Sequence, residues 1–412
     1  MEKQRALLVP AYMQQFSCIG SLCEDTCCAG WQVVIDRTTY KKYNKVHSEL
    51  KPALDSNIKR NRSAKGDEDY AKIALNPDLS CPMLNEEKLC SIQLRLGESY
   101  LSNVCSTYPR VSNIVNGVLE KSATMSCPEV VRLALLNSKG IEFNETEEAA
   151  EVRNAVKKQL DPSTALQDQL ERYFWELRIF SIQVLQNRNY TLAERLILLG
   201  MFYQNIEKLV KSNQVLEIPP LIASFTALLE GTGVSELLAG IPALTAIQME
   251  LLKNLIDTRV SKGVRNQRYI DCFGEFMYGI HYSKDSSIEE ISERYQSAYN
   301  HYYKPFMEQH EYILENYLVN YVYINLFPLG NGMDTFEEYI MMIIHYAMIK
   351  MHLIGMSGFH KENFGSEHVV KLIQSFSKTI EHNSLYLREV RELFRKNDFN
   401  SMAYMAILIQ NN

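Results

Sequence analysis

The chain has 412 residues, of which 46% are hydrophobic and 22% charged, and its formal net charge is −6. This size and composition are typical of a folded protein of two or three domains and exclude an intrinsically disordered chain. The negative charge excludes a general attraction to nucleic acid or to anionic lipid, although a local basic patch is compatible with it.

The N-terminal segment, MEKQRALLVPAYMQQF, has a short apolar run that Pro10 interrupts. A secretory signal needs a longer apolar run and a small-residue cleavage site. The most apolar later window, 339–356, contains two histidines and a lysine and is short for a membrane span. We therefore predict a cytoplasmic protein without a transmembrane helix. The apolar segment Met402–Ile409 fits either peripheral membrane association or a packed helix.

Eight of the nine cysteines lie in the first third of the chain, and only Cys272 lies outside it. Their spacing is C-x4-C-x3-C-C and then, after 52 residues, C-x8-C-x14-C-x21-C. A reducing cytoplasm disfavours stable disulfides, so the thiols indicate a metal or iron–sulfur site. The predicted metal ligands are Cys18, Cys23, Cys27, Cys28, Cys81, Cys90, Cys105 and Cys127.

Eight thiols exceed the four that one zinc ion or one iron–sulfur cluster needs. The chain therefore has either a second site or cysteines that bind nothing. The side chains of adjacent Cys27 and Cys28 are expected to diverge, so that one of them faces a second site. Trp31 and Tyr108 are expected to shield the thiols from solvent. A plain zinc site that only folds this region is the structural alternative.

The cysteine-rich region is predicted to be a small mixed α/β domain over residues 1–137. Short strands are expected at 31–35, 70–75 and 118–124. Asp36 is expected to cap a helix that runs to about residue 61 and is broken or kinked at Pro52. The polar stretch 138–163, with a helix stop at Gly140, is predicted to be a linker.

Residues 164–412 carry helical patterns throughout and are predicted to form a large all-helical domain. An apolar face at three- and four-residue spacing predicts a helix over 164–187. Helix starts are predicted at Thr191, Ser287 and Asp334, each followed three residues later by Glu. The predicted fold class is therefore mainly α, with a small cysteine-rich mixed α/β domain preceding the helices.

Two further patterns are better explained by structure than by a binding site. Gly231-Thr-Gly233 and Gly330-Asn-Gly332 do not follow strands, so turns or helix caps are predicted rather than a nucleotide-binding loop. His345 and His352 are seven residues apart on one helix face but lack an accompanying pair of carboxylates. We predict that they are satisfied core histidines rather than metal ligands.

The thiol region resembles a known family. The runs FSCIGSLCEDTCCAGWQVVID (16–36), CPMLNEEKLCSIQLRLGESYLSNVCSTYPR (81–110) and SCPEVVRLALL (126–136) are similar to the flagellin lysine-N-methylase family. The pieces Cys81-Pro-Met-Leu, Cys90-Ser-Ile and Cys105-Ser-Thr-Tyr-Pro resemble, more broadly, zinc- or iron-chelating CxxCxxCC domains. The segment PFMEQHEYILENYLVNYVYINLF (305–327) also resembles the methylase family.

The resemblance implies transfer of a methyl group from S-adenosylmethionine to lysine ε-amines on the surface of flagellin, its protein partner. It also implies an oxygen-sensitive [4Fe–4S] cluster bound by the cysteine motif. The spacing Cys23-x3-Cys27-Cys28 departs from the C-x3-C-x2-C signature of radical S-adenosylmethionine enzymes. The alternative is a non-catalytic, zinc-stabilised scaffold or assembly protein. In neither case is nucleic acid expected as a partner.

Methyl transfer to lysine needs a deprotonated amine, because the lysine pKa is about 10.4. It also needs aromatic or oxygen groups around a sulfonium cation. Such groups are concentrated between residues 299 and 323, where packing in the core is the structural alternative. They are Tyr299, Tyr302, Tyr303, Tyr312, Tyr317, Tyr321 and Tyr323, with Glu308, Glu311 and Glu315 between them, and Asn316 and Asn320 as possible cavity residues.

Overall fold

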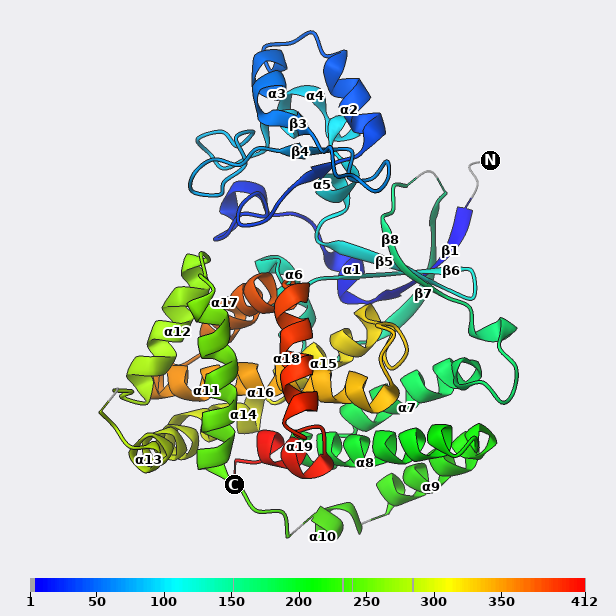
Figure 1. The fold of residues 1–412 in the computed structure, drawn as a ribbon, viewed down its shortest axis with the longest axis vertical. Coiled ribbons are helices and arrows are strands. Elements are labelled where there is room, and N and C mark those ends of the chain that lie inside the picture. The colour runs from blue at the N-terminus through cyan, green and yellow to red at the C-terminus, as the bar shows by residue number, and fades with distance from the viewer. Residues whose placement is uncertain (1–3, 151, 232, 239, 284, 412) are drawn as a thin grey trace. The chain divides into compact units, whose positions relative to one another are not determined.

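The computed structural model describes residues 4–150, 152–231, 233–238, 240–283 and 285–411. The chain forms two compact units (Figure 1). Unit 1 comprises Met1–Ile114, Val118–Val130 and Phe143–Gln159, and unit 2 comprises Val115–Gly117, Val131–Glu142 and Leu160–Asn412. Helices make up most of the secondary structure, which confirms a mainly α fold.

The larger sheet of unit 1 has the strand order β7-β1-β6-β5-β8. β1 runs parallel to β6 and antiparallel to β7, and Leu7 is in register with Leu119 and with Thr146. The strands are β1 (Gln4–Pro10), β5 (Arg110–Val115), β6 (Val118–Ala123), β7 (Phe143–Ala149) and β8 (Val156–Leu160).

The polar stretch 138–163, predicted to be a linker, contains β7 and β8. Both are edge strands of the sheet. Edge strands often carry charged residues, which discourage pairing with another chain, so apolar alternation is weak in them. Glu148 of β7 accepts hydrogen bonds from Arg5 at 2.7 Å and from Lys121, and these ion pairs join β7 to its neighbour β1 and to the next strand, β6.

A second sheet of unit 1 has the order β2-β4-β3, formed by β2 (Val34–Ile35), β3 (Ile58–Arg60) and β4 (Ala71–Ile73). With β6, these strands confirm the predictions at 31–35, 70–75 and 118–124 in shorter form. Two helices, α2 (Arg37–Asn44) and α3 (Lys51–Asn57), replace the single helix expected after Asp36. Asp36 caps α2 through a 2.8 Å bond from the Thr39 amide. Pro52 lies in the first turn of α3, where a missing N–H costs nothing.

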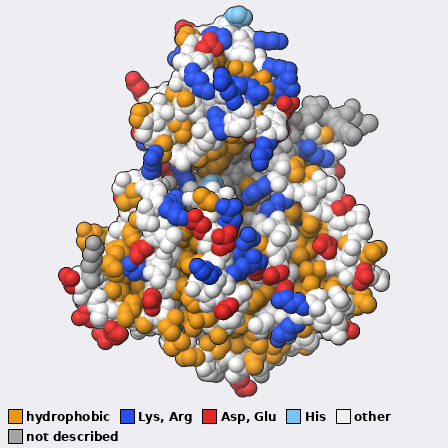
Figure 2. All heavy atoms as spheres, in the orientation of Figure 1, with side chains coloured by type: hydrophobic (Ala, Val, Ile, Leu, Met, Phe, Trp, Pro, Cys, Tyr) orange, Lys and Arg blue, Asp and Glu red, His pale blue; other side chains and the backbone are white. Residues whose placement is uncertain are grey.

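Part of the surface of unit 1 is rich in basic residues despite the negative net charge of the chain. On the face shown in Figure 2, Lys and Arg side chains gather over α2, α3 and β3. The exposed ones in this part of the chain are Arg37, Lys41, Lys42, Lys45, Lys59, Arg60, Arg62 and Lys65. The remaining helices of this region are α1 (Tyr12–Gln15), α4 (Ser91–Leu96), α5 (Asn103–Thr107) and α6 (Pro128–Leu135).

Unit 2 is built from helices. They are α7 (Phe174–Gln186), α8 (Leu192–Lys211), α9 (Ile218–Glu230), α10 (Gly233–Leu238), α11 (Thr245–Ser261), α12 (Gln267–Gly279), α13 (Ile288–Ala298), α14 (Lys304–His310), α15 (Tyr312–Ile324), α16 (Thr335–His360), α17 (Ser366–Phe376), α18 (Ser384–Lys396) and α19 (Met402–Ile409). Two π-helical segments, Tyr299–Tyr303 and Ser377–Glu381, interrupt this pattern.

The predicted helix starts are confirmed. Thr191 and Ser287 form reciprocal capping boxes at α8 and α13, and Asp334 caps α16 through the Glu337 amide. The helix expected over 164–187 begins only at Phe174, and a 3-10 turn, Leu170–Tyr173, directly precedes it. Gly231 caps the C-terminus of α9, and Gly330 lies in a turn, as predicted.

Helix α16 is the core helix of unit 2. Its length and composition would suit a membrane span, but every residue of its most apolar window is buried inside the protein. It contacts α8, α12, α13, α15, α17 and α19. Helix α19, the apolar segment 402–409, packs against α8, α11 and α16. Packing in the core therefore accounts for both apolar runs.

Candidate functional site

Five thiols gather around the hydrophobic core of the β2-β4-β3 sheet, and we call them the first thiol group. They are Cys27, Cys28, Cys81, Cys90 and Cys105. Cys81 is a buried member of that core, and Cys28, Cys90 and Cys105 pack against it. Cys27 is exposed, but its sulfur contacts that of Cys28. Four cysteines from distant parts of the sequence therefore lie in or against one hydrophobic core.

Backbone hydrogen bonds place these cysteines. The amide of Cys81 donates to the carbonyl of Cys28 at 2.8 Å, which joins the two halves of the motif. Cys90 precedes the first residue of α4, and Cys105 lies in the short helix α5. The Trp31 indole donates to the carbonyl of Cys27 at 2.8 Å, which fixes the loop that carries the Cys27–Cys28 pair.

The side chains of Cys27 and Cys28 do not diverge, contrary to expectation. Their Sγ atoms are 3.8 Å apart. Two sulfurs that each lie about 2.3 Å from one tetrahedral ion would be about 3.8 Å apart, so this spacing suits ligands of a single ion. Each iron of a [4Fe–4S] cluster takes one thiolate, so a cluster would use one sulfur of this pair.

The other three thiols, Cys18, Cys23 and Cys127, form a second thiol group. Burial raises the pKa of Cys127 to about 11, and the nearby thiols Cys23 and Cys18 add to that shift. The Tyr108 ring stacks on Trp31 with 6.2 Å between ring centroids. Burial is the main cause that raises the pKa of Tyr108, and electrostatic interactions with Cys127 and Cys27 also raise it. The aromatic pair predicted to shield the thiols therefore lies close to both groups.

Four thiols of the first group, Cys28, Cys81, Cys90 and Cys105, have raised pKa values and are protonated near neutral pH. Burial raises the pKa of Cys105 to about 12, and it also raises the pKa of Cys81 and of Cys90. The hydrogen bond with Cys27, followed by burial, raises the pKa of Cys28. Metal binding to such thiols must release protons, so it depends on pH. Among the described residues, no three His, Cys, Asp or Glu side chains are close enough together to hold a metal ion.

The aromatic segment 299–323 lies in unit 2 and is largely core. Tyr303, Tyr317 and Tyr323 are at most 4% exposed, and burial raises the pKa of Tyr303 and Tyr317 well above the usual value. Tyr302 and Tyr312 are partly buried, and Glu308 is exposed. Most of these tyrosines are therefore packing residues. The buried acidic and amide side chains between them have separate partners.

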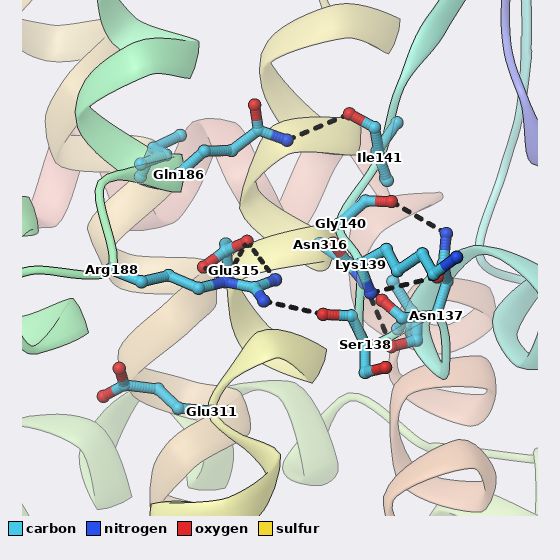
Figure 3. A network of polar contacts seen from close by, with 12 residues as sticks. Asn137, Ser138, Lys139, Gly140, Ile141, Gln186, Arg188, Glu311, Glu315 and Asn316 are labelled. Carbon is cyan, nitrogen blue, oxygen red and sulfur yellow. Dashed lines mark hydrogen bonds and ion pairs between the residues drawn. The ribbon is translucent and has the colours of Figure 1, made fainter.

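Glu315 and Asn316 have structural partners, as Figure 3 shows. Glu315 accepts from Arg188 Nη2 at 2.8 Å and from Arg195 Nη1 at 2.8 Å. Asn316 donates to the carbonyl of Asn137 at 2.9 Å. Arg188 also donates to the carbonyl of Ser138 at 2.6 Å. This network ties residues 137–141 to α15, so Asn316 serves packing rather than a cavity.

Lys350 is a buried titratable residue that the sequence patterns did not identify as a candidate site residue. It is 6% exposed, and burial lowers its pKa to about 7. Its Nζ donates to the carbonyl of Ile409 at 3.0 Å and lies 5.8 Å from the ring centres of Tyr299 and Tyr346. The sequence feature that could have identified it is a single lysine within an apolar helix. A lysine buried in such a helix loses its charge readily, because burial disfavours the charged form.

Comparison with known proteins gives the class of the chain. Residues 178–408 match the family model of the FliB lysine N-methylase C-terminal domain. A relative from Salmonella typhimurium, named Lysine-N-methylase, is 26% identical over 395 residues, which cover 93% of each chain. The Flagellar biosynthetic protein FliU of Salmonella muenchen is 36% identical over 133 residues, covering 31% of this chain and 76% of that protein. No solved structure matches.

These matches define a protein-lysine N-methyltransferase, an enzyme that methylates the ε-amine of lysine. The matched model spans more than half of the chain, and the chain belongs to the FliB lysine N-methylase family. The family resemblance inferred from the cysteine motifs is thereby confirmed.

Proposed function

We propose that the protein transfers methyl groups from S-adenosylmethionine to surface lysines of flagellin, and that it depends on a [4Fe–4S] cluster bound by its thiols. The family match over residues 178–408 carries this proposal. The name of the FliU relative, a flagellar biosynthetic protein, supports a flagellar substrate. We further propose that the reaction takes place in the cytoplasm.

The first thiol group supports the cluster. Thiolates are the ligands that iron–sulfur clusters prefer, and four thiols of this group, Cys28, Cys81, Cys90 and Cys105, lie in or against one core. Among the described residues no three of them are close enough to hold a metal ion, so cluster binding would have to draw them together. We propose that Cys81, Cys90 and Cys105, with either Cys27 or Cys28, are the ligands. When bound, a cluster would supply one-electron chemistry and would link segments distant in the sequence. The second thiol group is available for another site.

We propose a division of labour between the two parts of the chain. The cysteine-rich N-terminal domain, predicted over 1–137, would bind the cluster, and the helical domain, predicted over 164–412, would act on the lysine. The matched family model lies inside the helical part. In a polar transfer, the lysine must first lose a proton, because only the neutral amine has a lone pair to attack the methyl carbon.

The test is anaerobic purification followed by measurement of iron, sulfide and zinc, and then an assay with S-adenosylmethionine and unmodified flagellin. Mass spectrometry should show 14 Da additions on flagellin lysines. We expect iron and sulfide in the protein and loss of activity after exposure to air. Zinc without iron, combined with no methylation, would instead support the non-catalytic scaffold. Full methylation by metal-free protein would overturn the role of the cluster.

A further inference from the structure

Unit 2 contains a partly buried carboxylate that has two hydroxyl partners. Glu381 ends the π-helical segment Ser377–Glu381. Tyr317 donates its hydroxyl hydrogen to Oε1 of Glu381, and Ser377 donates to Oε2 at 2.5 Å. Among the residues that the structure describes, no lysine or arginine forms an ion pair with Glu381. Both carboxylate oxygens are thus oriented by neutral donors, and the negative charge is available to a cation.

His345 lies in the same neighbourhood and has an unused acceptor. Its Nδ1 is 2.7 Å from the carbonyl oxygen of Met341. Because a carbonyl can only accept, Nδ1 carries the hydrogen, and Nε2 of the neutral ring has the lone pair. The side chain is 3% exposed, and its Nε2 has no hydrogen-bond partner among the described residues. A buried acceptor without a partner needs an explanation.

His352 provides the comparison. It lies seven residues further along α16, and its Nδ1 is likewise 2.7 Å from a carbonyl, that of Met348. Its Nε2, however, accepts from the Tyr269 hydroxyl at 3.2 Å. The two histidines have the same tautomer and the same anchoring, and only His345 leaves its basic nitrogen unused. The prediction that both are satisfied core residues therefore holds for His352 alone.

Electrostatics and ring contacts bring these residues into one cluster. The ring centroids of His345 and Tyr321 are 5.5 Å apart. Burial lowers the pKa of His345, and the charge of Glu381 opposes that shift. Burial raises the pKa of Tyr317 and of Tyr321, and the charge of Glu381 raises both further. The charge of Glu338 also raises the pKa of Tyr321. The groups near His345 are therefore the Tyr321 phenol, the Glu381 carboxylate and the apolar Phe376 ring.

We propose that Tyr317, Tyr321, His345 and Glu381 form the site where the lysine ammonium of the substrate binds and loses a proton. Glu381 and the aromatic faces attract the cation, since carboxylates and rings both favour positive charge. Nε2 of His345 takes the proton. The broken N–H bond leaves its electron pair on the lysine nitrogen, which can then attack the methyl donor.

The subsequent transfer rests on the proposed function, in which a sulfonium compound donates the methyl group. A nitrogen–carbon bond forms as the carbon–sulfur bond breaks, and the electron pair of that bond passes to sulfur, which becomes a neutral thioether. The proton on His345 leaves through Glu381, the partly exposed member of the cluster. The site thus converts an unreactive ammonium into a nucleophile inside the helical unit.

His345→Gln tests the proton acceptor, with His352→Gln as the matched control. General-base catalysis contributes about 10²–10⁴-fold, so kcat should fall by at least about 10²-fold in H345Q and by less than about threefold in H352Q. Raising the pH should restore H345Q activity by about tenfold per pH unit up to the lysine pKa, because the amine then deprotonates unaided. Equal losses in both variants, or no recovery at high pH, would overturn the proposal.

Glu381→Gln tests the cation site. It should raise KM for the protein substrate by at least about tenfold, because a charged hydrogen bond is lost. Tyr317→Phe should have a smaller effect of the same kind. An unchanged KM in E381Q, with the protein folded by circular dichroism, contradicts this role.

A binding experiment separates this inference from the proposed function. n-Butylamine serves as the probe of the lysine ammonium, and histidine-selective NMR follows both rings in the intact protein. Saturable shifts of the His345 signals, absent in E381Q and absent at His352, are expected even if flagellin is not the substrate. If wild-type protein methylates flagellin but butylamine leaves His345 unperturbed, the assignment of the amine site is wrong and the proposed function stands.

Discussion

Oε2 of Glu315 lies 2.8 Å from Nη1 of Arg195, and both side chains are only 1% exposed. Arg188 approaches the same carboxylate from a position that is 44% exposed, at 2.8 Å. Glu311 holds the other nitrogen of the Arg195 fork at 2.7 Å. One buried ion pair, supported by two partly exposed charges, therefore joins α8 to α15.

Glu315→Gln should be strongly destabilising. Removing one partner of a buried pair typically costs about 3–5 kcal/mol, and we expect about 3 kcal/mol here because the partly exposed Glu311 still compensates Arg195 in part. Arg188→Ala should cost at most about 1 kcal/mol, because exposed pairs contribute little. Thermal unfolding followed by circular dichroism measures both. Similar melting temperatures for the two variants would show that Arg195 is stabilised without Glu315.

Local signals in the sequence predicted the helices well, and long-range contacts explain what was missed. The Thr191 and Ser287 caps depend on residues three positions apart, so the pattern alone identifies them. Glu381 meets Tyr317 only through folding, and its π-helical segment has no local sequence signature. The strand β7 (FNETEEA) was missed because an edge strand carries polar residues on both faces.

The cysteine spacing indicated a thiol site but not how the thiols divide. The Cys27–Cys28 pair was expected to split between two sites, because adjacent side chains usually diverge. The loop fixed by Trp31 instead holds the two sulfurs together. Cys81 joins them through a backbone hydrogen bond to Cys28, which no spacing rule reveals.

Serine substitutions should separate the two thiol groups. Cys81→Ser, Cys90→Ser and Cys105→Ser should each lose most of the bound iron, because the first group supplies the proposed ligands. Cys272→Ser is the matched control, since that thiol is buried in α12 of unit 2 and should leave the iron content unchanged. Iron per chain after anaerobic purification is the measurement. Retention of iron by C81S, C90S and C105S would exclude this ligand set.

Lys350 should make stability depend on pH. Burial lowers its pKa to about 7 in the folded protein, from 10.5 in the unfolded chain. Between these values the unfolded state binds more protons, so stability rises with pH, by at most about 1.4 kcal/mol per unit. Lys350→Met should remove this rise. Urea unfolding at pH 7, 8 and 9 compares the two proteins, and identical slopes would show that Lys350 stays charged when buried.

Gly279→Ala should disrupt the contact between α12 and α16. A Cβ atom at Gly279 would lie 1.8 Å from the carbonyl oxygen of Gly355 and 2.7 Å from the amide nitrogen of Phe359. Both are backbone atoms of the core helix, so relief requires the helices to separate, and the cost should reach about 3 kcal/mol or more. Gly274→Ala is the control on the same helix, because a Cβ there meets nothing within 4 Å. That substitution should be neutral or stabilising by up to about 1 kcal/mol, since alanine favours the helix. Thermal unfolding of the two variants decides: equal stabilities would mean that α12 and α16 are not packed this closely in solution.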